Sequence, residues 1–205
     1  MASAKAALNA VHKAAVFNRR VEVLSRHLAG IIPTGGKVLD LGAGDGSIAH
    51  ALMTLRPDLA VEGVDVLLRP QTLIPVTLYD GVTLPYPDDA FDYVTIVDVL
   101  HHTDDPAAVL REAARVANRG VVIKDHLVQG PGARTTLRFM DWVGNRGHDV
   151  RLPYNYLTPA EWQRAFAAAN LLEVRRVAAL NLYPAPFTWL FDRSLHFVAL
   201  LAPQT

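Results

Sequence analysis

The sequence predicts an α/β fold built on a parallel sheet, and two features support this. Short apolar runs alternate with segments of helical periodicity, as in buried parallel strands joined by helical crossovers. The apolar runs lie at 37–41, 60–66, 91–100 and 120–127, with helical segments at 46–56 and 106–117. A glycine-rich turn follows the first run, at the place where open α/β sheets bind ligands.

A helix is predicted ahead of the first strand, over residues 4–29. Gly30 and Pro33 then stop the pattern. The apolar positions that recur at helical spacing are Leu8, Val11, Ala15, Val21, Leu24 and Leu28.

The last third of the chain predicts one more helix and two strands. In LTPAEW, Thr158 is a plausible N-cap, Pro159 takes the first helical position, and Glu161 stands three residues after the cap. The helix is expected to end near residue 170, and the strands to lie at 172–180 and 195–201.

Composition narrows the classes of function. The 205 residues carry 20 basic and 20 acidic side chains, a balance that argues against a nucleic-acid partner. The lack of cysteine excludes a disulfide framework, a thiolate nucleophile and a zinc–thiolate site. No apolar run approaches the length of a membrane span. We therefore expect a cytoplasmic protein without stable membrane insertion, although residues 1–20, alanine-rich and basic, faintly resemble a transit peptide.

The glycine turn, in VLDLGAGDGSIAH, discriminates between two classes of ligand. A dinucleotide-binding turn has the pattern G-x-G-x-x-G, whereas this chain has Gly42, Gly44 and Gly46, with serine at position 47. Asp40 and Asp45 would repel a pyrophosphate but suit a ligand that carries an ammonium and a sulfonium. The pattern therefore counts against a nicotinamide-dependent oxidoreductase.

The motifs resemble, in order, those of class I S-adenosylmethionine-dependent methyltransferases. VLDLGAGDG is similar to the first motif of that family, and VEGVDV, YDGVTLPYPDDAFD and VTIVDVLHHTDDP follow at matching intervals. REAARVANRGVVI and LTPAEWQRAFAAANLLEV extend the likeness, which covers about residues 36–180. The closest likeness is to the small-molecule, methyltransferase type 11-like branch that includes ubiquinone/menaquinone-type enzymes. The resemblance implies a Rossmann-like, doubly wound, seven-stranded sheet, mostly parallel with an antiparallel last strand, and S-adenosyl-L-methionine as cofactor.

The resemblance also implies a set of cofactor-binding residues. Asp65 would accept both ribose hydroxyls, Asp80 with Gly81 would hold the adenine amino group, and Asp40 would orient the methionine ammonium. Each of these acids also has a simpler interpretation, as a turn or loop residue. The full set is Asp40, Gly42, Ala43, Gly44, Asp65, Val66, Asp80, Gly81, Asp98 and Val99, where Asp98 would offer its backbone carbonyl to the same ammonium.

Methyl transfer to a hydroxyl or an acidic carbon needs a base, and histidine suits neutral pH. His101 and His126 are the candidate catalytic bases, because each is expected at the carboxyl end of a strand. His102 and His148 are weaker candidates. Each of these histidines could instead be structural or merely line the site.

The segment between Asp65 and Asp80 departs from the family pattern. It is too short for a full crossover helix and a strand, and Pro70 and Pro75 oppose a long helix. We expect the third helix to be short or missing, the neighbouring strand to depart from the family pattern, and the cofactor pocket to be more open.

The chain is predicted to be a single methyltransferase domain, 1–205. Its parts would be an N-terminal helical cap, a cofactor-binding half, an acceptor-side insertion, and a C-terminal helix with strands, at 1–33, 36–128, 129–157 and 158–205. Aromatic residues in the insertion and in YPAPFTWLF suit a small apolar or aromatic acceptor, a peripheral membrane contact or a dimer contact.

Three questions stay open at this point. The chain could be a monomer or a homodimer. The acceptor atom is undetermined. A non-catalytic binding or scaffold protein on the same fold remains the alternative function, while methylation of nucleic-acid bases is disfavoured by the neutral charge and by DVLHH in place of an Asn/Asp-Pro-Pro-aromatic run.

Overall fold

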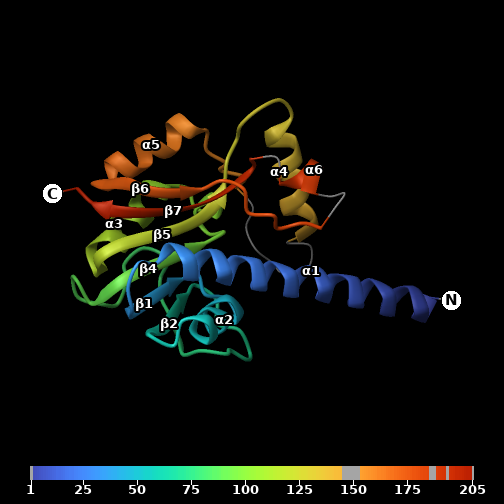
Figure 1. Ribbon diagram of the computed structural model, residues 1–205, viewed down its shortest axis with the longest axis horizontal. Helices are drawn as coiled ribbons and strands as arrows, with labels where there is room; N and C mark the ends of the chain where they lie inside the picture. The colour runs from blue at the N-terminus through green and yellow to red at the C-terminus, as the bar shows by residue number, and fades with distance from the viewer. Residues whose placement is uncertain (1, 145–152, 185–187, 193, 205) are drawn as a thin grey trace.

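The computed structural model describes residues 2–144, 153–184, 188–192 and 194–204 and consists of a seven-stranded sheet with helices on both faces (Figure 1). The strand order is β3-β2-β1-β4-β5-β7-β6. The strands are β1 (Gly36–Leu41), β2 (Leu59–Asp65), β3 (Val76–Leu78), β4 (Phe91–Val97), β5 (Ala117–His126), β6 (Leu171–Val177) and β7 (His196–Pro203). The helices are α1 (Ala2–Ile31), α2 (Ser47–Leu55), η1 (Leu100–His102), α3 (Pro106–Val116), α4 (Ala133–Gly144), α5 (Pro159–Ala168) and α6 (Thr188–Phe191).

The pairing confirms the fold class expected from the sequence. β3, β2, β1, β4 and β5 are parallel to one another, whereas β7 runs antiparallel to both β5 and β6. The carboxyl ends of the five parallel strands therefore meet at one edge of the sheet, where this kind of fold places its ligands.

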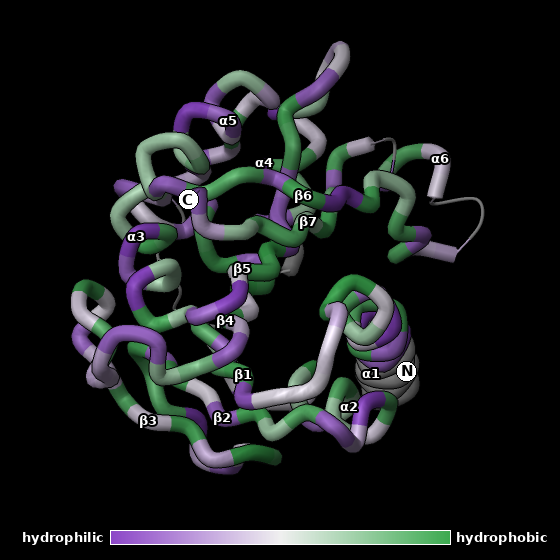
Figure 2. The backbone as a smooth tube through the Cα atoms, turned by 60° about the vertical axis from the view of Figure 1, so that its left-hand side comes forward, coloured by the Kyte–Doolittle hydropathy of each residue, from purple (hydrophilic) through white to green (hydrophobic). Residues whose placement is uncertain are grey.

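Side-chain alternation along the central strands builds one apolar core on each face of the sheet. On β5, Val121 and Ile123 belong to the core beneath α3 and α5, while Val122 faces the core beneath α1 and α2. Figures 1 and 2 both place α1 beside α2. Burial on both faces explains why these strands are continuous apolar runs.

The segment after β2 lacks a helix, as its length and prolines predict. It crosses directly to β3, which has three residues. The backbone N–H of Leu73 donates to the carbonyl of Asp45 (2.8 Å), and that of Gly63 donates to Pro75 (2.9 Å), so the segment lies against the glycine turn. Leu73 and Leu78 remain more than half exposed, because no helix covers them.

Two predicted boundaries shift for local reasons. β4 ends at Val97 rather than near residue 100, because Asp98 adopts φ 56° and the 3₁₀ turn η1 follows. β5 begins at Ala117, directly after α3, and is longer than predicted. Among the described residues, no helix is both long enough and apolar enough to cross a membrane.

The predicted start of the late helix is confirmed as a reciprocal cap. The Thr158 hydroxyl accepts from the Glu161 backbone N–H (3.4 Å), and the Glu161 carboxylate accepts from the Thr158 backbone N–H (2.7 Å). α5 then packs Trp162 and Phe166 into the core.

Thr158→Ala should therefore lower the free energy of unfolding by about 1 kcal/mol, since it removes one half of the cap. Urea unfolding followed by circular dichroism measures the change. Thr54→Ala, which removes an exposed hydroxyl that bonds back to the His50 carbonyl within α2, is the control and should shift stability by less than about 0.5 kcal/mol. Equal effects of the two substitutions would contradict the cap.

Candidate active site

The glycine turn at the carboxyl end of β1 has three left-handed residues with different requirements. Gly42, Gly44 and Gly46 have φ of 80°, 60° and 77°. A Cβ at Gly42 would lie 2.3 Å from a methyl of Val99, and one at Gly46 would lie 2.6 Å from Ile74. A Cβ at Gly44 would enter open space. Packing therefore explains the outer two glycines, while Gly44 leaves its backbone open to a ligand.

Asp65, at the end of β2, faces this open glycine. Its Oδ2 accepts from the Gly44 backbone N–H (2.8 Å), and its Oδ1 accepts from the Leu67 N–H (2.9 Å). The two bonds fix the carboxylate, and each oxygen keeps a further lone pair for another donor. The neighbouring Ala43 packs with the core, and Val66 is exposed beside the turn.

Asp40 is a buried carboxylate within β1, two residues before Gly42. Its Oδ1 accepts from the Thr95 hydroxyl at 2.7 Å. Burial raises the pKa of Asp40 to about 6, although the Thr95 hydrogen bond opposes the rise. A cation near Asp40 would offset this burial, so the residue suits a positively charged ligand group.

Asp80 and Gly81 form a turn just after the carboxyl end of β3. The Asp80 carboxylate accepts from the backbone N–H groups of Val82 and Thr83 (both 2.8 Å), which lowers the pKa of Asp80. Gly81 has φ 81°. These contacts match the simpler interpretation of the pair as an Asp–Gly turn, and both use the same carboxylate oxygen, Oδ1.

Asp98 has more partners than the sequence suggested. Its carboxylate pairs with Arg20 of α1 (2.6 Å) and with the buried Lys124 of β5 (2.5 Å). Burial opposes ionisation of Asp98, but the charges of Lys124 and Arg20 outweigh it and hold the pKa of the carboxyl well below its usual range. The sequence suggested only a backbone role for Asp98, which stays a prediction, and the structure adds a side-chain ion pair. Val99 fixes the next turn by packing against Gly42.

His101 lies between two carboxylates. Its Nδ1 is 2.7 Å from Asp125 Oδ1 and its Nε2 is 3.6 Å from Asp141 Oδ1, while Tyr156 donates to the other Asp141 oxygen at 2.8 Å. Burial disfavours the imidazolium, but the charge and hydrogen bond of Asp125, followed by Asp141, outweigh burial and raise the pKa of His101 to about 10. His101 is therefore protonated at neutral pH, which disfavours its expected role as a base.

His126, at the end of β5, has the opposite electrostatics. Its Nδ1 lies 3.3 Å from His101 Nδ1 and 3.4 Å from Asp125 Oδ1. Burial, together with the positive charges of His101 and Lys124, lowers the pKa of His126. No hydrogen bond joins its Nε2 to another residue in the described part of the chain. His126 is thus a neutral imidazole at neutral pH, and its Nε2 is the ring nitrogen that lies away from His101 and Asp125.

The charged side chains around His101 and His126 form a cluster whose positive and negative charges balance. Two sets of side chains have the spacing of a metal site, Asp98 with His101, Asp125 and His126, and His101 with His102 and Asp141. Three carboxylates, of Asp98, Asp125 and Asp141, face three cations, Arg20, Lys124 and protonated His101. Since these cations already neutralise the carboxylates, the cluster favours protons over a metal ion.

Sequence reasoning missed four members of this cluster: Arg20, Lys124, Asp125 and Asp141. It placed Tyr156 among the aromatic residues of the acceptor-side insertion but not against Asp141. Lys124 and Asp125 carried a signal, because they interrupt the apolar strand GVVIKDHL and a buried charge needs a partner. His102 is partly buried, and its Nδ1 has no partner among the described residues. His148, Arg146 and Arg151 of the predicted insertion lie outside the described residues.

Comparison with known proteins decides the family. Residues 13–175 match the family described as "Methyltransferase domain". The chain belongs to this family.

Similarity to individual family members is partial. The chain is 33% identical over 112 residues to 27-O-demethylrifamycin SV methyltransferase of Amycolatopsis mediterranei, covering 47% of this chain and 41% of that one. It is 30% identical over 148 residues to the ubiquinone/menaquinone biosynthesis C-methyltransferase UbiE of Cupriavidus taiwanensis, covering 63% and 60%. The matches thus span between about two fifths and three fifths of these curated relatives. The structure of CalO1, a methyltransferase in calicheamicin biosynthesis in its SAH-bound form, superposes with a TM-score of 0.64 at 20% identity, covering 94% and 55%.

Protonation of His101 predicts a pH-dependent stability. A pKa raised from 6.5 to about 10 adds stability that is complete below pH 6.5 and is lost as the pH rises through about 10. Urea unfolding across this range should therefore show a larger difference between the wild type and Asp125→Asn at the acidic end. The imidazole NMR signals of wild-type His101 should still be those of the protonated ring at about pH 8, above the ordinary histidine pKa of about 6.5. A neutral ring at that pH would contradict the assignment; the exposed His50 is the internal control.

Proposed function

We propose that the protein transfers a methyl group from S-adenosyl-L-methionine to a small apolar, aromatic or lipid-like acceptor. The observation that carries the proposal is the meeting of two features at one edge of the sheet. A carboxylate-flanked glycine turn with an open backbone lies at the end of β1, and a neutral histidine ends β5. Membership of the methyltransferase domain family supports the same reaction class.

The residues of the turn fit the cofactor. Asp65 would accept from the ribose hydroxyls, Gly44 leaves room for close backbone approach, and buried Asp40 would face the methionine ammonium. Asp80 and Gly81 would hold the adenine amino group, and the backbone of Asp98 would lie beside the ammonium. When bound, the cofactor supplies a methyl group activated by a sulfonium. The protein then has to position the acceptor and exclude water.

His126 would act as the general base for a hydroxyl or an acidic carbon. Asp125 lies beside its Nδ1, so a proton there would leave Nε2 with a lone pair for the acceptor. His101, held as an imidazolium, would position this ring rather than take a proton. The acceptor would lie beneath α1 and α4, which are tied to the same cluster through Arg20 and Asp141.

Asp65→Ala should weaken binding of S-adenosylmethionine and S-adenosylhomocysteine at least about tenfold, since charge-assisted hydrogen bonds of about 1.5–3 kcal/mol are lost. Calorimetric titration measures both affinities, and thermal unfolding checks that the variant is folded. Asp58→Ala, at the opposite end of β2, is the control and should leave both affinities unchanged. Unchanged affinity in Asp65→Ala would remove the ribose assignment.

His126→Asn should lower kcat at least about a hundredfold while cofactor affinity stays within about twofold, because only proton transfer is removed. Release of S-adenosylhomocysteine with phenolic and quinol acceptors gives the rate. Since the pKa of His126 is lowered, wild-type kcat should hold on the acidic side to a pH below the ordinary histidine value and then fall. His50→Asn is the surface control. If the variant keeps the wild-type kcat, the acceptor needs no base. A neutral amine is an acceptor of that kind.

The missing third helix favours a second candidate, a non-catalytic binding or scaffold protein. Exposed Leu73 and Leu78 leave the adenine side of the turn uncovered. The same titrations discriminate the two functions. Micromolar binding of both compounds supports the enzyme, whereas a folded protein that binds neither supports the scaffold.

A further inference from the structure

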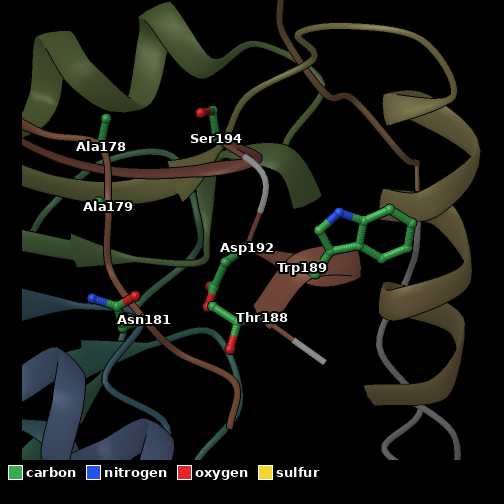
Figure 3. Close-up of a pocket in the computed structure, with 7 residues that line it drawn as sticks. All are labelled: Ala178, Ala179, Asn181, Thr188, Trp189, Asp192 and Ser194. Carbon is green, nitrogen blue, oxygen red and sulfur yellow. The ribbon is translucent and has the colours of Figure 1, made fainter. Parts of the chain in front are cut away.

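Large aromatic side chains are exposed on the helices outside the sheet edge that carries the candidate site. Trp189 on α6 is 78% exposed, Trp142 on α4 is 49% exposed, and Phe139 lies one turn from Trp142 with the ring centroids 6.3 Å apart. Figure 3 shows the indole of Trp189 standing out from α6 towards α4. We call the five exposed side chains Phe17, Phe139, Trp142, Trp189 and Leu190 the apolar rim.

The three helices that carry the apolar rim lie at one end of the molecule. In Figure 1, α4 and α6 both lie above the part of α1 that extends beyond the sheet. β6 and β5 run in the same direction, because both are antiparallel to β7, so the connection from β6 to α6 begins at the edge where β5 ends. The apolar rim is therefore on the acceptor side of the proposed active site.

The charge of these segments is strongly one-sided, although the whole chain is neutral. Residues 1–21, 133–142 and 183–191 contain six basic residues and one acid. The basic residues are Lys5, Lys13, Arg19, Arg20, Arg134 and Arg138. Arg20 is already paired with Asp98, and Glu22 and Asp192 follow directly after the first and third segments, so the positive excess facing an occupant is smaller than this count. The single acid, Asp141, is buried. An occupant of this end must accept exposed aromatic side chains and complement positive charge.

We propose that the apolar rim is a peripheral docking surface for an anionic lipid membrane. Tryptophan and phenylalanine suit the headgroup boundary, where the ring is buried and the indole N–H stays hydrated. Basic residues around such rings add attraction to anionic headgroups. A second copy of the chain fits less well, because a two-fold contact would bring two basic surfaces together.

Docking in this orientation turns the acceptor side towards the lipid. A lipid-like acceptor would then be on the same side of the molecule as the proposed active site. The proposal itself does not depend on methyl transfer, because attachment to vesicles is measured without cofactor or acceptor. Failure of one proposal is therefore distinguishable from failure of the other.

Vesicle co-sedimentation tests the proposal with the full chain. The wild type should sediment with vesicles of equal phosphatidylcholine and phosphatidylglycerol, much less with pure phosphatidylcholine, and less at high salt. Trp142→Ala/Trp189→Ala should weaken the attachment at least about tenfold, since each ring buries apolar area at the headgroup boundary. Lys13→Gln/Arg134→Gln should weaken attachment to the anionic vesicles while leaving the small attachment to phosphatidylcholine unchanged.

The matched control is Leu172→Ser/Val174→Ser on β6, where two similarly exposed apolar side chains lie outside the apolar rim. This variant should sediment like the wild type. Tryptophan fluorescence of the wild type should shift to shorter wavelength on vesicle addition, and the shift should vanish in the double tryptophan variant, which keeps only the buried Trp162.

Two results would overturn the proposal. One is a wild-type chain that stays in solution with anionic vesicles, or that sediments equally after loss of both tryptophans. The other is a dimer in solution that Trp142→Ala/Trp189→Ala dissociates, since the apolar rim would then be a contact between copies.

Discussion

The buried carboxylate of Asp125 is the group on which the candidate site depends. It has no exposed surface, and it accepts from the backbone N–H of Leu100 (3.1 Å), from the N–H of His126 (2.7 Å) and from the His101 ring (2.7 Å). A buried carboxylate without such donors would cost several kcal/mol. Its burial therefore imposes one arrangement on the end of β5 and on η1, and it sets the charge of His101.

Charge also attaches the outer helices to the sheet. Asp98 joins Arg20 of α1 to Lys124 of β5, and Asp141 of α4 faces His101. Each pair joins side chains from two different elements, and its charges cancel only when both side chains are in place. If one helix were displaced, the other side chain would remain as an unpaired buried charge. These two helices are thus positioned by the same cluster that would carry the proposed chemistry.

The sheet could be predicted from the sequence because the spacing of apolar residues along a strand or helix is a local property of the chain. β5 alternates between two cores, and the spacing between Asp65 and Asp80 was too short for a helix. The Arg20–Asp98 pair joins residues 78 positions apart, and no local pattern marks such a contact. The adjacent histidines of DVLHH could be recognised as site residues, but their protonation could not, because it depends on Asp125 and Asp141 from other elements.

The lowered pKa of His126 restricts the acceptors that the proposed base can serve. A weaker base gains less driving force for proton transfer, so its partner must release a proton easily. Phenols, enols and carbon acids between carbonyl groups meet this condition, whereas a simple alcohol does not. Lys124 and protonated His101 maintain the low pKa from within the fold. If His126 is the base, as proposed, the electrostatics of the cluster thus favour an acceptor that is itself acidic.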